Sequence, residues 1–248
     1  MEITIQRLRE LADRSYSSGQ YVFTDFLSIA ELSVYYENEV ELSYVKPALY
    51  GGCEIAERKM IRFGNEEELG YSVDFPIAAL SVRPLSKKFA DELNHRDFLG
   101  ALMNLGIKRE LLGDIFVREN EACVFCKDAI ADFIAENLTR IKHTSVKVER
   151  TEDTEALTAP NLEEKVIQVS SPRIDAVISK VWSLSRQDAL ELFPQEKVYL
   201  NGRSCTENAK KLSAGDIISV RGKGRFIFAE ELSLSKKGKQ NCKVEIYS

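Results

Sequence analysis

Residues 173–226 read RIDAVISKVWSLSRQDALELFPQEKVYLNGRSCTENAKKLSAGDIISVRGKGRF, and this stretch decides the fold of the C-terminal part of the chain. Its apolar residues recur at i, i+3, i+4 and i+7, the spacing of the buried face of a short helix, at Ile174, Val177, Ile178 and Val181. Basic residues stand at the helix starts and turns around this frame. The combination predicts a surface that binds a polyanion, and the obvious candidate for that polyanion is RNA.

A second helix is predicted to begin at Ser185. Ser185 and Asp188 have the spacing of a capping box, with Asp in place of the usual Glu or Gln. Arg186 therefore lies in the first turn, where the helix dipole disfavours a cation by about 1 kcal/mol or less. A bound anion would remove this conflict. The alternative is an ordinary exposed arginine on an amphipathic helix.

Turns carry the remaining basic residues of the stretch. Asn201-Gly202 tolerates the positive φ of a type I′ hairpin turn, and Gly215-Asp216 marks a second turn. The segment 221–225 is a glycine-rich turn with three cations, which suits contact with phosphates and gives salt-dependent binding with little base specificity. The candidate RNA-binding residues are Arg173, Lys180, Ser185, Arg186, Gln187, Asn201, Arg203, Lys210, Lys211, Arg221, Lys223 and Arg225.

The charge of the chain is distributed unevenly. The formal net charge is −5, which by itself argues against nucleic acid. Residues 170–248 hold 14 Lys and Arg against 9 Asp and Glu, a net of +5, whereas residues 1–169 hold 20 against 30, a net of −10. A basic module on an acidic body is consistent with a polyanion binder, because the local field at the contact decides binding. The alternative is chance variation along a charged chain.

The stretch resembles the RNA-binding module named after small-subunit ribosomal protein S-four. The resemblance rests on the segments Arg173-x-Asp175, Ser185-Arg186 with Ala189, Val198 with Asn201-Gly202, Gly215-Asp216, and 221–225. One position departs from the family pattern: Glu196 stands where the family usually has glycine before the hairpin strand. We therefore expect a reshaped turn at Glu196.

The rest of the chain resembles the bacterial YlmH type over almost its whole length. The matching segments are 51–58, 95–102, 106–115 and 169–180. This resemblance implies a ribosome-associated factor with an N-terminal domain, a central RNA-binding domain and the C-terminal module. It further implies binding to large ribosomal subunits obstructed by peptidyl-tRNA, and support of untemplated C-terminal tailing of the nascent chain.

Periodicity predicts an α+β protein of three small domains. Residues 1–72 are expected to form an α+β domain with helices over 3–14 and from Thr24 or Asp25, and strands over 40–45 and 58–63. Residues 73–150 read β (77–82), α (96–105), β (114–117), β (122–126), α (128–138) and β (144–148), a ferredoxin-like βαββαβ order. The helix over 128–138 is expected to point Ile130, Phe133, Ile134 and Leu138 inward. Residues 151–165 are expected to be a linker, 166–235 the two-helix and hairpin module, and 236–248 a basic tail.

A second basic cluster lies in the central part. His95, Arg96, Lys108 and Arg109 form a possible second RNA patch, with a solvated helix end as the alternative. His95-Arg96-Asp97 resembles a kinase catalytic loop. That loop needs Asn five residues after Asp, where this chain has Leu102, and no glycine-rich phosphate loop precedes it. We therefore read Asp97 as a residue at a helix start.

The cysteines and the glycine pair predict neither a metal site nor a cofactor site. Five cysteines at irregular spacing fit reduced thiols. Cys123-x-x-Cys126 lacks a matching ligand pair for zinc, so packed strand cysteines are favoured over half a zinc site or a redox pair. Gly51-Gly52 lacks the Gly-Lys-Ser/Thr ending of a phosphate loop, and a plain turn is favoured. Phe125 is the only aromatic residue in the segments 77–82 and 122–126, which are expected to be the middle strands of the central sheet. Stacking of RNA bases on this sheet is therefore not expected.

Three functions remain open from the sequence. The leading hypothesis is a non-enzymatic factor that binds rRNA or tRNA and the large ribosomal subunit in ribosome-associated quality control. The second is an RNA-modifying enzyme, of the pseudouridine synthase or methyltransferase type, that carries this module. The third is a protein-binding scaffold whose basic face meets an acidic partner. No secretory signal or membrane span is evident, so we expect a cytoplasmic monomer without cofactors.

Overall fold

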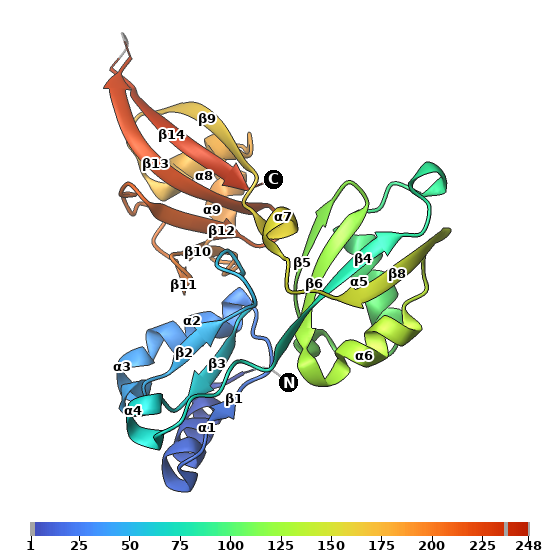
Figure 1. Ribbon diagram of the computed structural model, residues 1–248. Helices are drawn as coiled ribbons and strands as arrows, with labels where there is room; N and C mark the ends of the chain where they lie inside the picture. The colour runs from blue at the N-terminus through green and yellow to red at the C-terminus, as the bar shows by residue number, and fades with distance from the viewer. Residues whose placement is uncertain (1–2, 236–237, 248) are drawn as a thin grey trace. The chain divides into compact units, whose positions relative to one another are not determined.

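Figure 1 shows the computed structural model, which describes residues 3–235 and 238–247. The chain divides into two units. The first contains residues 1–31 and 38–159, and the second contains 32–37 and 160–248. Each unit combines helices with a β-sheet, which confirms the α+β class. Apart from residues 32–37, the expected N-terminal and central parts both lie in the first unit.

The N-terminal part begins with a helix that the sequence predicts. α1 (Ile5–Ser18) buries Leu8, Leu11 and Ala12, and the Thr4 side chain caps it by accepting a hydrogen bond from the Arg7 amide at 3.2 Å. A three-stranded sheet follows, in the order β1 (Val22–Phe23), β3 (Met60–Phe63) and β2 (Ala48–Tyr50). The remaining helices are α2 (Ile29–Glu37), α3 (Glu39–Leu42), the 3-10 turn Ser43–Val45 and α4 (Glu66–Leu69).

Two local expectations for this part are wrong. The strand expected over 40–45 is helical, because Leu42 and Val45, three residues apart, are the buried pair, whereas Val40 is 83% exposed. The second helix begins at Ile29 and not at Thr24. Thr24 is instead buried beside β3, where its hydroxyl accepts a hydrogen bond from the Ile61 amide at 2.9 Å. Tertiary contacts override local propensity at both places.

The central part has the predicted βαββαβ order. Its strands lie in the order β5-β6-β4-β8-β7 and all pair antiparallel, which is the ferredoxin-like arrangement with β7 added at one edge. The elements are β4 (Ile77–Pro84), α5 (His95–Asn104), β5 (Leu112–Arg118), β6 (Glu121–Lys127), α6 (Asp128–Asn137), β7 (Arg140–Ile141) and β8 (Thr144–Arg150), with 3-10 turns at Lys87–Phe89 and Arg109–Leu111.

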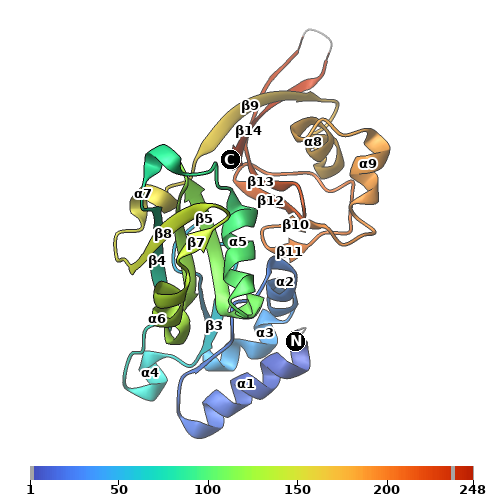
Figure 2. The same cartoon turned by 90° about the vertical axis from the view of Figure 1, so that its right-hand side faces the viewer.

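The two helices of the central part pack on one face of its sheet. Ala122, Val124 and Cys126 of β6 share their core with buried residues of α5 and α6 (Figure 2). Ile134 and Leu138 are buried as expected, together with Ala131, whereas Phe133, also expected to point inward, is 46% exposed. The expected inward direction of Phe133 is therefore wrong.

Residues of the N-terminal part cover the other face of this sheet. Cys123 and Phe125 of β6 pack with Phe26 and Met60 in one buried cluster. A Cβ atom on Gly52 would lie only 2.2 Å from the Phe125 ring, so glycine is required where the chain passes over this face. Phe125 is thus buried and does not offer a surface for base stacking.

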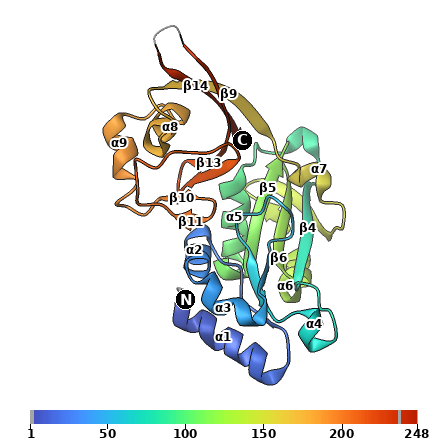
Figure 3. The same cartoon turned by 90° about the vertical axis from the view of Figure 1, so that its left-hand side faces the viewer.

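The second unit is a six-stranded antiparallel sheet in the order β11-β10-β12-β13-β14-β9. Figure 3 shows α8 and α9 side by side against this sheet. Their apolar residues share one core with those of the strands. The elements are β9 (Leu162–Val169), α8 (Ile174–Val181), α9 (Arg186–Glu191), β10 (Val198–Leu200), β11 (Arg203–Ser204), β12 (Asp216–Val220), β13 (Gly224–Leu234) and β14 (Gln240–Tyr247).

The structure corrects the expected linker and tail. Residues 155–158 form α7 (Glu155–Thr158), and residues 162–165 belong to β9. Residues 240–247, expected as part of a basic tail, form β14, which pairs with β9 along eight residues and with β13. Its buried side chains are Cys242 and Val244, whose alternation builds the strand into the core. Of the expected tail, residues 236, 237 and 248 lie outside the described residues.

Candidate nucleic-acid interface

Arg173 and Asp175 form a bidentate ion pair at the start of α8. The Arg173 Nε and Nη2 atoms donate hydrogen bonds to the two Asp175 carboxylate oxygens at 3.0 and 2.8 Å. The Asp175 side chain is 5% exposed and the Arg173 side chain 36%. Because both carboxylate oxygens are used, the guanidinium is fixed in one plane. The predicted buried face of α8 is confirmed, since its four apolar residues are all buried.

A groove of about 610 Å³ opens beside this ion pair. It lies along α8, between the end of β9 and the start of α9, and four of its side chains are cationic: Arg173, Lys180, Arg186 and Lys239. The acidic side chain in its lining is Asp175, which Arg173 already neutralises. Ser170 and Ser171 add hydroxyl groups, whereas the Ser179 hydroxyl already donates to the Leu184 carbonyl at 2.8 Å. The groove thus offers an excess of positive charge with hydrogen-bond donors, as a phosphate chain requires.

Three of the predicted residues meet in this groove, and one cation there was missed as a site. Arg173 and Arg186 were predicted from the helix starts and Lys180 from the outward side of the first helix, whereas Lys239 was assigned only to the tail. Lys239 takes its place through the pairing of β14 with β9, a contact between distant parts of the sequence. The available signal was the alternation of Cys242, Val244 and Ile246, which indicates a strand.

The start of α9 has the predicted cap. The Ser185 hydroxyl accepts a hydrogen bond from the Asp188 amide at 3.1 Å and donates one to the Asp188 carboxylate at 2.7 Å. Arg186 follows with an exposed side chain. Gln187 donates from Nε2 to the Glu191 carboxylate at 3.1 Å along the helix surface. Ser185 thus serves the helix end, and Arg186 is the group that lines the groove.

Lys210 and Lys211 lie beside the start of α8. The Lys210 carbonyl accepts a hydrogen bond from the Ile174 amide at 2.9 Å, and Lys211 forms a β-bridge with Arg173. Both lysine side chains are exposed. These backbone contacts place two further cations next to Arg173, although neither lines the groove itself.

In the hairpin between β10 and β11, the predicted RNA-binding residues Asn201 and Arg203 make contacts within the protein. Asn201 and Gly202 have φ values of 51° and 81°, as a type I′ turn requires. The Asn201 amide donates to Asp216 at 2.8 Å, and its oxygen accepts from the Ile217 amide at 2.9 Å. The Arg203 guanidinium lies 5.7 Å from the ring centre of Tyr36, in the segment 32–37 of the same unit.

The three cations of the segment 221–225, around the turn between β12 and β13, do not line the groove. Arg221 donates from Nη2 to the Tyr199 hydroxyl at 3.3 Å. The Arg225 guanidinium stacks 3.9 Å from the ring centre of Tyr247 in β14. Lys223 is exposed at the tip. The groove thus holds only some of the predicted cations, and in the segment 221–225 two of the three contact tyrosines.

The four residues of the second predicted patch have different surroundings. Arg109 donates to the Leu112 and Gly113 carbonyls at 2.7 and 3.0 Å, and burial together with Arg58 lowers its pKa to about 10. Burial and Arg109 also lower the pKa of His95. Lys108 is exposed. Arg96 instead lines a different hollow with Arg140 and Lys142.

Arg58 and Asp114 complete a structural cluster around Arg109. The Arg58 guanidinium donates to the Leu112 and Phe26 carbonyls at 3.0 and 2.9 Å. The Asp114 carboxylate accepts from the amides of Glu57 and Arg58 at 2.5 and 3.3 Å, while burial raises its pKa. These charged groups hold backbone segments together. Arg58, Arg109 and Asp114, which lie in the segments 51–58 and 106–115, therefore have structural roles.

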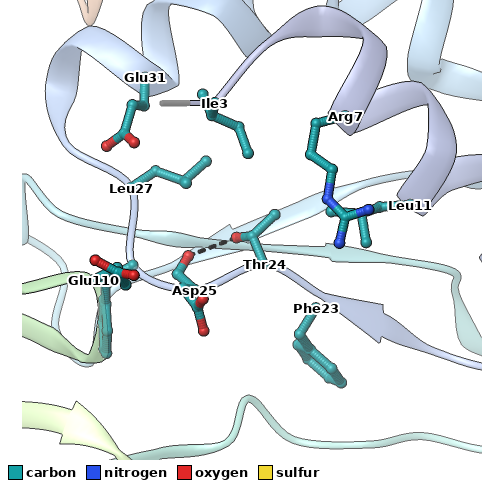
Figure 4. Close-up of a pocket in the computed structure, with 10 residues that line it drawn as sticks. Ile3, Arg7, Leu11, Phe23, Thr24, Asp25, Leu27, Glu31 and Glu110 are labelled. Carbon is teal, nitrogen blue, oxygen red and sulfur yellow. Dashed lines mark hydrogen bonds between the residues drawn. The ribbon is translucent and has the colours of Figure 1, made fainter. Parts of the chain in front are cut away.

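Figure 4 shows a pocket of about 150 Å³ in the first unit. Three carboxylates line it, those of Asp25, Glu31 and Glu110, against the single cation Arg7. Arg7 is itself paired with Glu10 at 2.9 Å. The acidic lining disfavours a phosphate ligand, so the groove along α8 remains the candidate interface.

The two cysteines of the Cys-x-x-Cys segment lie on opposite faces of their sheet. Cys126 packs toward the helices, and Cys123 packs with Phe26 and Met60. Burial raises the pKa of both thiols to about 12. Across residues 3–235 and 238–247, we find neither a cluster of side chains suited to a metal ion nor a helix long and apolar enough to cross a membrane.

Comparisons with known proteins find similar sequences and a similar solved structure. Residues 71–155 match the family model described as "Putative RNA-binding domain in YlmH". The "Ribosome-associated protein quality control protein P2" of Bacillus subtilis (strain 168) is 32% identical over 193 residues, which cover 77% of this chain and 74% of that protein. The solved structure "Cell division protein ylmH from Streptococcus pneumoniae" aligns with a TM-score of 0.48 at 20% identity, covering 63% of this chain and 98% of that one.

Proposed function

Because this chain belongs to the family of the ribosome-associated protein quality control protein P2, we propose that it is a ribosome-associated factor that binds RNA. In finer terms, it binds large ribosomal subunits obstructed by peptidyl-tRNA, through rRNA, tRNA or both. The RNA-binding surface is the groove along α8.

The observation that carries this proposal is the set of four cations in one groove. Arg173, Lys180, Arg186 and Lys239 face an acidic group that is already paired. Each phosphate neutralised releases counterions and contributes about 0.7–0.9 to the slope of log affinity against log salt. Because Asp175 offsets one of the four charges, the net excess of three gives a slope of about −2 to −3 from this groove. Lys210 and Lys211 beside it extend the positive surface.

We also propose that the factor acts without catalysing a reaction. Three charged groups of the first unit whose pKa burial shifts, Arg58, Arg109 and Asp114, bind backbone amides and carbonyls, which supports a structural role for them. Nucleoside analysis of tRNA and rRNA after incubation with the protein tests this point. A newly modified nucleoside would favour an RNA-modifying enzyme.

The proposal assigns parts of the chain to separate roles. Residues 166–235 carry the RNA-binding module, residues 73–150 a second RNA-binding domain, and residues 1–72 an N-terminal domain that supports the central sheet. We propose that the protein works as a cytoplasmic monomer without a cofactor.

The test is co-sedimentation of the full chain with purified large ribosomal subunits, either empty or carrying peptidyl-tRNA. We expect the protein to pellet with obstructed subunits, and the variant Arg173→Gln/Arg186→Gln to stay in the supernatant. Lys46→Gln, an exposed lysine of the first unit, is the matched control. Equal pelleting of both variants, or binding that survives RNase digestion of the subunits, would overturn the proposal in favour of a protein partner.

A further inference from the structure

A second hollow gathers cations in the first unit. It encloses about 550 Å³ between α5, the end of α6 and β7. Figure 2 shows α5 beside β7, and the two elements are in contact. Arg96 comes from the first turn of α5, Arg140 from β7, and Lys142 from the turn that follows β7. Three segments that are separate in sequence thus place cations around one space.

Two of these cations are available to a ligand. Arg96 and Arg140 are exposed, and neither forms an ion pair or a side-chain hydrogen bond with the part of the chain that the structure describes. Lys142 pairs with Asp97 at 2.7 Å, and the Asp97 carboxylate also accepts a hydrogen bond from the Asn94 amide at 2.9 Å, closing the cap of α5. The acidic group of the hollow is thus committed to the fold.

Gly100 lies on the wall of this hollow, in the middle of α5. Apart from its chain neighbours and the backbone of its own helix, a Cβ atom at this position would meet no atom within 4 Å, and the φ of Gly100 is not positive. Neither packing nor backbone conformation therefore requires glycine at this position. Glycine is nevertheless present, even though it lowers helix stability relative to alanine. An open backbone surface next to two arginines is consistent with close approach of a ligand chain.

The polar neighbours of Gly100 fit a phosphate ligand. Asn104 and Thr139 line the hollow with exposed side chains and offer an amide and a hydroxyl as donors. Arginine forms paired hydrogen bonds with phosphate oxygens, which suits Arg96 and Arg140 to the backbone of a nucleic acid.

We propose that this hollow binds phosphates of a second RNA segment, apart from the segment held by the groove along α8. The proposal rests on the proposed function, namely that the protein binds RNA. It replaces the sequence-based patch of His95, Arg96, Lys108 and Arg109 with the set Arg96, Arg140 and Lys142. The hollow lies inside residues 71–155, the region that matches the RNA-binding family model.

The experiment measures the affinity of the full chain for purified large ribosomal subunits, and for protein-free rRNA from them, across salt. For Arg96→Gln/Arg140→Gln we expect weaker binding to both probes and a slope of log affinity against log salt that is smaller by about 1.4–1.8, for two lost phosphate contacts. Lys147→Gln, an exposed lysine of β8 outside the hollow, should leave the slope unchanged.

A second variant separates binding from folding. Gly100→Gln places a neutral side chain into the hollow and replaces glycine by a good helix former, so its thermal midpoint should rise while its affinity falls. If this variant and the double variant both bind as the wild type does, the inference is overturned. It is also overturned if only binding to intact subunits weakens, because the partner is then a protein.

The same assay keeps this inference separate from the proposed function. If Arg173→Gln/Arg186→Gln lowers the slope while the hollow variants do not, RNA binding by the groove stands and the hollow has no part in it. If the wild-type chain binds neither probe, the proposed function and this inference are both overturned.

Discussion

The guanidinium of Arg173 is held by both carboxylate oxygens of Asp175, and the carboxylate is almost fully buried. The Asp175 Oδ1 atom also accepts a hydrogen bond from the Ala176 amide at 2.9 Å. This arrangement fixes the direction of Arg173 at the edge of the groove. The Arg-x-Asp pattern was visible in the sequence, but its pairing was not predicted.

Asp175 is therefore expected to act as a positioning residue for Arg173. Asp175→Asn keeps the side chain's size but removes the charge that holds the guanidinium, which should lower the free energy of unfolding by about 1–3 kcal/mol. RNA affinity should fall further than stability alone explains, because Arg173 loses its fixed orientation. Urea unfolding and RNA titration check the two effects.

A double-mutant cycle provides the control for this prediction. If Asp175 acts through Arg173, Asp175→Asn should change RNA affinity little in an Arg173→Gln background. Equal effects of Asp175→Asn on affinity in both backgrounds would show that Asp175 only stabilises the fold.

Arg225 and Lys223 are predicted to differ in their effect on stability. Arg225 stacks on Tyr247 and links β13 to β14, so Arg225→Ala should lower the free energy of unfolding by about 0.5–1 kcal/mol. Lys223→Ala, two residues away at the exposed tip, should leave stability within about 0.5 kcal/mol. Urea unfolding of the two variants makes the comparison, and equal losses would contradict the stacking contribution.

Glu196 adopts a φ of 51°, the left-handed conformation that glycine favours. Glu196 thus replaces the glycine of the family pattern but has a backbone conformation that glycine favours. Glu196→Gly should raise the free energy of unfolding by about 0.5–1 kcal/mol, because the strain of a side chain there exceeds the added freedom of the unfolded chain. Glu196→Ala is the control and should give no such gain. A loss of stability in Glu196→Gly would contradict the strain argument.

The buried thiols predict a loss of stability at alkaline pH. Burial raises the pKa of Cys123 and Cys126 to about 12, against a usual value of 9.0. Between these values the unfolded chain has released the thiol protons and the folded chain retains them, so the free energy of unfolding falls as pH rises. Unfolding measured from pH 8 to 11 should show this decline, with a shallower slope in Cys123→Ala/Cys126→Ala. An unchanged slope in that variant would assign the decline to other groups.

The sequence predicted those elements whose apolar residues follow a clear period. The central βαββαβ order, α1 and the buried face of α8 follow from such local patterns. The segment 40–45 was misassigned because alternating Val40, Leu42 and Tyr44 resemble a strand, whereas burial selects Leu42 and Val45. A short apolar run fits either period, so only tertiary packing decides between them.

The candidate site was predictable only where position along a helix fixed it. Arg173, Lys180 and Arg186 follow from the starts and faces of α8 and α9. Lys239 required the pairing of β14 with β9, and Arg140 required the contact of α5 with β7. Arg109 looked like a surface cation but is bonded to backbone carbonyls, since its surroundings come from distant segments. Such long-range contacts leave no local signature in the sequence.

The central claim is that the groove along α8 holds RNA phosphates, and one measurement tests it most directly. The affinity of the wild-type chain and of Arg173→Gln/Arg186→Gln for large ribosomal subunits carrying peptidyl-tRNA is measured between 50 and 200 mM salt. We predict that the variant binds more weakly and that its slope of log affinity against log salt is smaller by about 1.4–1.8. An identical slope and affinity in the two proteins would contradict the account.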